Sequence, residues 1–208
     1  MKILVTGATG LVGSAIAKRL AAKGETVLAL VRDPDAAARA LPGVALARGD
    51  ITDPASHAPA MRGVELVFHA AGMPEQWQRD EGIFDRVNRR GTANVLEAAL
   101  AAGVKRVVYT STMDVFAAPR GGTLVETNLD PAPKHTAYER SKQGADREAE
   151  RIRREGLDVV HVNPSAVYGP SPVPHVALDG FFLRLLNGEI PLLPPGGMSV
   201  VYVDGLGP

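Results

Sequence analysis

Cysteine, net charge and long apolar runs are all missing from this sequence. With no cysteine among 208 residues, disulfides, thiolate nucleophiles, iron–sulfur clusters and cysteine-based zinc sites are excluded. The five histidines are scattered, with no pair at i, i+3 or i, i+4, so we expect no metal site. The 23 basic and 23 acidic residues cancel, so the chain has no general attraction to nucleic acid or to an anionic membrane.

Apolar runs are short throughout. None reaches the 18 residues or so that would suggest a transmembrane helix, and the run Ile3–Val5 is too short for the core of a signal peptide. We therefore expect a cytosolic protein. The 45% hydrophobic and 22% charged fractions are those of an ordinary globular protein. A chain of this length can bury roughly 70% of its unfolded surface, which is enough to fold without disulfides or metals.

Short apolar runs alternate with longer amphipathic ones. The spacing predicts helices at 11–23, 54–61, 82–102 and 136–155, and strands at 3–5, 26–31, 44–46, 65–69, 106–110 and 157–162. This alternation is typical of an α/β fold of the Rossmann type, a doubly wound parallel sheet with helices on both faces. The proline-rich segments 117–135 and 163–176 follow the last two strands, and we expect them to be irregular loops at the ligand-binding edge of the sheet.

A glycine-rich segment, TGATGLVG at Thr6–Gly13, follows the first predicted strand and opens the first predicted helix. Gly7 permits a tight turn, Gly10 lets the backbone approach a pyrophosphate, and Gly13 lets the helix pack close to the strand. Free N–H groups and the dipole at the start of the helix favour an anion. A tight turn without a ligand is the alternative. The context favours a dinucleotide site lined by Gly7, Thr9, Gly10, Leu11, Val12 and Gly13.

The G-x-x-G-x-x-G spacing resembles the extended, epimerase/dehydratase-like branch of the short-chain dehydrogenase/reductase superfamily. The resemblance implies that Asp50 and Ile51, after the third strand, contact the adenine of a nicotinamide cofactor. It also implies that Ala70, Ala71 and Gly72, after the fourth strand, pass close to the cofactor, because their side chains are small. We expect His69 to be a buried, hydrogen-bonded histidine and Asn88 to be structural.

The end of the second strand bears on the choice between NADP and NAD. An NADP enzyme needs a cation for the 2′-phosphate, and an NAD enzyme needs a carboxylate for the ribose hydroxyl. Arg32 lies at this position and is followed by Asp33. A guanidinium suits a phosphate dianion, so we favour NADP(H). Asp33 keeps NAD as the alternative, and Arg32 could also be a solvated charge at the strand end.

A Y-x-x-x-K pair, Tyr138 and Lys142, lies on one predicted helix, and its i, i+4 spacing places both side chains on one face. A neighbouring ammonium lowers the pKa of a phenol, so we expect Tyr138 to exchange a proton near neutral pH. The fifth strand ends in a hydroxyl-rich segment that resembles the family's substrate-binding serine or threonine. Thr112 is the better match and Ser111 the alternative. The resemblance thus implies Thr112, Tyr138 and Lys142 as catalytic residues, and Tyr138 and Lys142 as cofactor contacts too.

The segment after the sixth strand resembles the family's loop beside the nicotinamide, which implies cofactor contacts by Pro164, Ser165 and Val167. Tyr168 is expected to be a packing residue. We divide the chain into an NAD(P)-binding domain, 1–162, and a partial substrate-binding region, 163–208. The chain is about one third shorter than the family's usual length. We therefore expect a truncated product that lacks most of the C-terminal substrate domain and turns over poorly.

Taken with the resemblance, these residues predict an NAD(P)-dependent oxidoreductase acting on a small-molecule alcohol or carbonyl, similar to dihydroflavonol reductases and hydroxysteroid dehydrogenases. A nucleotide-sugar epimerase or dehydratase is the alternative. A catalytically weak NAD(P)-binding or sensor protein is the alternative of another class. The family commonly dimerises through the helices at 82–102 and 136–155, so the resemblance also implies a homodimer.

Overall fold

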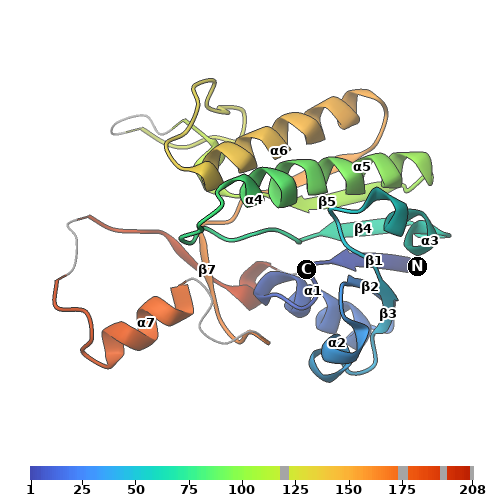
Figure 1. The fold of residues 1–208 in the computed structure, drawn as a ribbon, viewed down its shortest axis with the longest axis horizontal. Helices are drawn as coiled ribbons and strands as arrows, with labels where there is room; N and C mark the ends of the chain where they lie inside the picture. The colour runs from blue at the N-terminus through green and yellow to red at the C-terminus, as the bar shows by residue number, and fades with distance from the viewer. Residues whose placement is uncertain (118–121, 173–177, 193–195, 207–208) are drawn as a thin grey trace.

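The computed structural model describes residues 1–208 except 118–121, 173–177, 193–195 and 207–208 (Figure 1). Its centre is a six-stranded sheet of order β3-β2-β1-β4-β5-β6, in which every neighbouring pair is parallel. The strands are β1 Lys2–Thr6, β2 Thr26–Val31, β3 Ala45–Arg48, β4 Leu66–His69, β5 Arg106–Thr110 and β6 Val159–Val162.

Helices cover both faces of this sheet. Figure 1 shows α5 and α6 on one face and α1 and α2 on the other. The first group comprises α4 Gly82–Phe84, a π-helical segment η2 Asp85–Arg90, α5 Gly91–Ala101 and α6 Ala137–Arg154. The second comprises α1 Leu11–Ala22 and α2 Pro34–Ala40. The short helices η1 Pro54–Ser56 and α3 His57–Met61 precede β4, and η3 Met113–Val115 follows β5.

Two apolar clusters hold the layers together. Along β1, Leu4 belongs to the cluster beneath α5 and α6, whereas Ile3 and Val5 belong to the cluster beneath α1 and α2. This alternation follows from the two-residue period of a strand. Both faces of the central strand are therefore apolar, as a doubly wound sheet requires. The predicted Rossmann-type α/β fold is confirmed.

The second half of the chain differs in part from expectation. The segment 163–176 is not wholly irregular, because β7 Ala166–Tyr168 pairs in parallel with β8 Val200–Tyr202. A strand this short depends on its distant partner, so local pattern could not reveal it. In the described part of 117–135, Leu129 forms an isolated β-bridge with Phe116, the residue just before this segment. The division into 1–162 and 163–208 stays a prediction.

The remaining elements are α7 Leu178–Leu186, which Figure 1 shows apart from the main sheet, and η4 Val203–Leu206. Among the described helices, none is long and apolar enough to cross a bilayer. Ala145 and Ala149 of α6 are fully buried within the chain itself, so these small residues already have an intrachain role. The homodimer stays a prediction.

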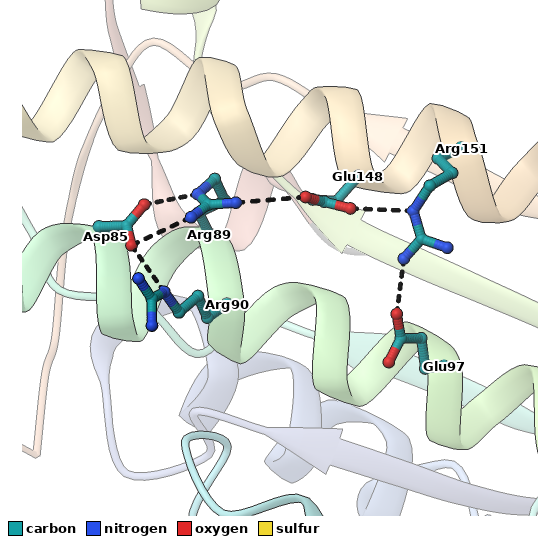
Figure 2. Close-up of polar contacts among 6 residues, drawn as sticks. All are labelled: Asp85, Arg89, Arg90, Glu97, Glu148 and Arg151. Carbon is teal, nitrogen blue, oxygen red and sulfur yellow. Dashed lines mark hydrogen bonds and ion pairs between the residues drawn. The ribbon is translucent and has the colours of Figure 1, made fainter.

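Ion pairs join the outer sides of η2, α5 and α6 (Figure 2). Arg89 of η2 binds Glu148 of α6 at 3.4 Å, and Arg151 of α6 binds Glu97 of α5 at 2.6 Å. The side chains are partly exposed, so each pair contributes little alone. The pairs nevertheless span the seam between α5 and α6.

Candidate active site

The turn after β1 is packed against the end of β4 through backbone atoms. Gly7 has a φ of +70°, and a Cβ added there would lie 2.6 Å from the backbone of Ala70 and Ala71. A Cβ on Gly13 would lie 2.2 Å from the Gly7 carbonyl oxygen. Only glycine satisfies both contacts. The predicted roles of Gly7 in the turn and Gly13 in close helix packing are thereby explained by the geometry.

The start of α1 fits an anionic ligand. Gly10 is the N-cap residue and makes no side-chain capping hydrogen bond, so the first amides of the helix, those of Leu11, Val12 and Gly13, have no acceptor within the helix. Thr9 is exposed on the same turn. Unpaired amides at a helix N-terminus are suited to a pyrophosphate. These residues are thus compatible with the diphosphate of a nicotinamide dinucleotide.

His69 fastens the end of β4 to its neighbours. One ring nitrogen lies 2.7 Å from the Thr6 hydroxyl and the other 2.9 Å from the Thr92 hydroxyl. Burial, and then the nearby Lys142 ammonium, lower the pKa of His69 to about 3. The ring is therefore neutral at ordinary pH. His69 is the buried, hydrogen-bonded histidine that we expected.

Asn88 ties the segment after β4 to α6. Its side chain accepts from the Met73 amide at 2.7 Å and donates to the Ser141 hydroxyl at 2.9 Å. The Met73 segment continues from Ala70, Ala71 and Gly72, so Asn88 holds this backbone against the helix that carries Tyr138. This is the structural role that we expected.

The two residues at the end of β2 have different surroundings. Asp33 is the N-cap of α2, and its carboxylate accepts from the Asp35 and Ala36 amides at 3.1 Å each. Arg32 is exposed and makes no hydrogen bond or ion pair with other described residues. The Asp33 carboxylate already has a local role, whereas the Arg32 guanidinium is available to a ligand.

Asp50 forms a compact turn after β3. Its Oδ1 accepts from the amide and from the hydroxyl of Thr52, both at 2.8 Å. The Ser56 hydroxyl donates to the Asp50 carbonyl at 3.0 Å, and the His57 ring lies 3.0 Å from the same oxygen. Ile51, the next residue, is buried. The turn holds the Asp50 carboxylate at the edge of the sheet, where the family resemblance places the adenine.

Thr112 and Tyr138 are brought together from separate elements. Thr112 caps η3 at the end of β5, and its hydroxyl donates to Asp114 Oδ2 at 2.7 Å. The Tyr138 phenol lies within hydrogen-bonding reach of Thr112, a contact that lowers the pKa of Tyr138. Tyr138 also packs edge-on against Phe84, with ring centroids 6.2 Å apart. Phe84 and Asp114 are neighbours of Tyr138 that sequence reasoning did not assign to the site.

Ser111 is turned away from Tyr138. Its hydroxyl donates to Asp146 Oδ1 at 2.6 Å in a buried contact. The two candidate hydroxyls at the strand end therefore face different neighbours. Thr112 is the one beside the tyrosine, which is compatible with the choice of Thr112, and its catalytic role stays a prediction.

The pKa of Tyr138 differs from our expectation. Burial first, and then the Asp114 carboxylate, raise it to about 12, although the Thr112 hydrogen bond acts in the opposite direction. The expected lowering by Lys142 is wrong for this structure because the ammonium is directed elsewhere. Lys142 Nζ donates to the Thr110 carbonyl at 3.0 Å and lies 4.9 Å above the Tyr109 ring. Burial lowers its own pKa to about 8.

The segment after β6 lies against the end of β5. Asn163 donates to the Thr112 carbonyl at 3.1 Å, and the Met113 amide donates to the Pro164 carbonyl at 3.1 Å. Val167 belongs to β7, next to the predicted cofactor contact Ser165. Pro164 is thus beside Thr112. Tyr168 packs edge-on against Phe182 and Tyr202, in agreement with its expected packing role.

Comparison with known proteins assigns the chain to a family. The family model described as the NAD dependent epimerase/dehydratase family matches residues 3–204. The chain belongs to the NAD-dependent epimerase/dehydratase family. It is 35% identical to sterol demethylase protein B of Methylococcus capsulatus over 97% of this chain and 62% of the relative.

Two further similarities refine the comparison. A Synechocystis protein provisionally named as a dihydroflavonol 4-reductase is 34% identical over 96% of this chain and 59% of its own length. DesIV, a dTDP-glucose 4,6-dehydratase of Streptomyces venezuelae solved with NAD bound, is 30% identical with a TM-score of 0.82, over 98% of this chain and 69% of that one. The chain spans about three fifths of the length of these curated relatives.

The packing around Gly13 gives a testable consequence. Gly13→Ala places a methyl group against the Gly7 carbonyl oxygen, so we expect a loss of about 1–3 kcal/mol in the free energy of unfolding. Urea denaturation measures this change. Gly197→Ala is the matched control, since a Cβ there meets nothing within 4 Å. Equal stability of the Gly13 and Gly197 variants would contradict the packing.

The Asp114 carboxylate gives a second prediction. Asp114→Asn removes a negative charge beside Tyr138, so the pKa of Tyr138 falls from its value of about 12, by about one unit or more. The phenolate then appears at lower pH, which ultraviolet difference titration detects, with Tyr138→Phe assigning the signal. Asp35→Asn, in α2, removes the same charge elsewhere. An unshifted titration in Asp114→Asn would show that the carboxylate does not act on Tyr138.

Proposed function

We propose that this member of the epimerase/dehydratase family is an NAD(P)-dependent oxidoreductase that reduces a carbonyl or oxidises the corresponding alcohol. The observation that carries the proposal is the meeting of Thr112 and Tyr138 at the end of β5, with Lys142 one helical turn further along α6. The glycine turn after β1 lies at the same edge of the sheet because all six strands are parallel.

Each residue has a distinct task in this proposal. The nicotinamide cofactor, when bound, donates or accepts the hydride. The amides at the start of α1 bind its diphosphate, Thr112 binds the substrate oxygen, and Tyr138 exchanges a proton with that oxygen. With a pKa of about 12, the Tyr138 phenol holds its proton at neutral pH. It is therefore suited to act as a proton donor, which favours carbonyl reduction as the direction of reaction.

The charges near Tyr138 favour an uncharged substrate. The carboxylates that raise its pKa are those of Asp114, Glu75 and Glu139. A carbonyl compound bearing a carboxylate or a phosphate would meet repulsion at this position. An uncharged ketone or aldehyde would not. We therefore place neutral carbonyl compounds ahead of anionic ones as substrates.

A nucleotide-sugar epimerase or dehydratase is the second candidate. The similarity to DesIV, a dTDP-glucose 4,6-dehydratase, favours it. In the sequence, the expected ligand-edge loops 117–135 and 163–176 together contain two lysine or arginine residues, Arg120 and Lys134. So few cations for a sugar-nucleotide diphosphate favour the simple oxidoreductase. The chain spans only about three fifths of its curated relatives, so a weakly active NAD(P)-binding or sensor protein is the candidate of another class.

The surroundings of Arg32 and Asp33 support NADP(H) as the preferred cofactor. Arg32 is free to bind a 2′-phosphate, whereas Asp33 caps α2. We expect Arg32→Ala to weaken NADPH binding about 10-fold or more, the order of a charge-assisted hydrogen bond, and to leave NADH binding unchanged. Fluorescence titration measures both affinities. Arg39→Ala, which removes a cation from the nearby helix α2, is the control. Equal affinity of the unsubstituted protein for NADPH and NADH would refute the preference.

Tyr138→Phe tests the proton transfer itself. Loss of the phenolic hydroxyl removes the proposed proton donor, so turnover should fall by about 10²–10⁴-fold, while the NADPH affinity is retained. A panel of neutral ketones, followed by NADPH oxidation, provides the assay. Tyr168→Phe is the matched control because Tyr168 has a packing role. A protein that binds NADPH and turns over no member of the panel would support the sensor instead.

A further inference from the structure

A buried pair of opposite charges lies beneath the proposed site. Lys142 and Asp146 are one helical turn apart on the face of α6 that packs on the sheet, and they are only 6% and 1% exposed. Side chains at i, i+4 are neighbours on a helix surface. A buried ammonium is costly unless a compensating charge lies nearby.

The direct contacts of the Lys142 ammonium are uncharged. They are the Thr110 carbonyl oxygen, at 3.0 Å, and the face of the Tyr109 ring. Both favour a cation, but neither carries a full negative charge. The contacts therefore orient the ammonium without neutralising it.

The titratable groups around Lys142 come from four elements, and all but one are neutral or basic. Tyr138 of α6 and Tyr109 of β5 hold their protons at pH 7, because burial raises the pKa of each. His69 of β4 is neutral because its pKa is about 3, and the imidazole of His161 of β6 cannot supply a negative charge. Within the described part of the chain, Asp146 is the carboxylate whose charge acts on Lys142.

Asp146 is itself held on both sides. Its Oδ1 accepts the Ser111 hydroxyl at 2.6 Å, and its Oδ2 lies 3.6 Å from His161 Nδ1. The contacts come from β5 and β6, and they bridge the sheet to α6. A hydroxyl that donates to a carboxylate stabilises its charged form. Ser111 precedes Thr112 and takes no part in the proposed proton transfer. Its hydroxyl instead stabilises the charged form of Asp146.

We propose that Asp146 is a positioning residue that holds Lys142 in its protonated form, and that Ser111 orients the Asp146 carboxylate. This inference deepens the proposed function, on which it rests, because the family resemblance implies that Lys142 contacts the nicotinamide cofactor. Burial alone lowers the pKa of Lys142, and the Asp146 carboxylate raises it again. Without Asp146, the ammonium would lose its proton within the neutral range.

The test measures the protonation of Lys142 directly. The protein is labelled with [ε-13C]lysine, and the Cε shift of Lys142 is followed against pH, with Lys142→Arg assigning the signal. In the unsubstituted protein we expect a midpoint near pH 8. In Asp146→Asn the midpoint falls by about one to three units, and in Asp146→Glu, which restores the charge, most of the fall is reversed. An unchanged midpoint in Asp146→Asn overturns the proposal.

Two controls separate charge from general damage. Asp158→Asn removes an exposed carboxylate that pairs with Arg106, and it should leave the Lys142 midpoint unchanged. If Asp146→Asn does not fold, the unsubstituted protein still decides the matter. With the Asp146 carboxyl carbon labelled with 13C, its chemical shift at pH 7 must be that of a carboxylate, and the shift of a carboxylic acid overturns the proposal.

Neither titration requires cofactor or substrate, so each is independent of the proposed function. NADPH titration of the same samples tests that function separately. Failure of the unsubstituted protein to bind NADPH would contradict the oxidoreductase and leave the Lys142 result standing. NADPH binding with an unshifted Lys142 midpoint in Asp146→Asn would contradict the role of Asp146 alone.

Discussion

The backbone contact between the turn after β1 and the end of β4 is the constraint on which the site depends. Gly7 lies against the backbone of Ala70 and Ala71, and Gly13 brings α1 against Gly7. The strand order reverses here, because the chain builds outward from β1 on one side and continues from β4 on the other. A crevice for a ligand forms at such a reversal. A side chain on Gly7 would push the turn away from the end of β4, and one on Gly13 would push α1 away from the turn.

Polar residues on neighbouring strands lie in one row beneath this crevice. Thr6, His69, Tyr109 and His161 are register partners across β1, β4, β5 and β6. Each ends or nearly ends its strand, so the row marks where the apolar core gives way to the site. His69 stacks on Tyr109, and Tyr109 meets His161 edge-on. The Lys142 ammonium lies over one member of this row, the ring of Tyr109.

Periodicity predicted the main helices and strands well, because apolar spacing directly reflects burial. It did not predict α2, although Asp33 followed by Pro34 is a recognisable start of a helix. It could not predict β7, since that strand exists only through its pairing with β8. The π-helical segment η2 within the predicted helix 82–102 likewise has no signal in the apolar spacing.

Motif spacing singled out the residues of the candidate site, but it could not predict their electrostatics. The i, i+4 spacing places Tyr138 and Lys142 on one face, yet it does not say where the ammonium points. The choice between Ser111 and Thr112 also depended on the tertiary structure. Each hydroxyl donates to a carboxylate, Asp146 and Asp114 respectively, and neither carboxylate was recognisable from the sequence as part of the site.

The two carboxylates have the same effect on different groups. Asp114 raises the pKa of Tyr138, and Asp146 raises the pKa of Lys142. A negative charge stabilises the protonated form of either group, whether that form is a neutral phenol or an ammonium. Burial raises the pKa of Tyr138 and lowers the pKa of Lys142, because it penalises the charged form of each group, the phenolate and the ammonium. The carboxylates reinforce burial at Tyr138 and oppose it at Lys142, so both groups retain their protons at neutral pH.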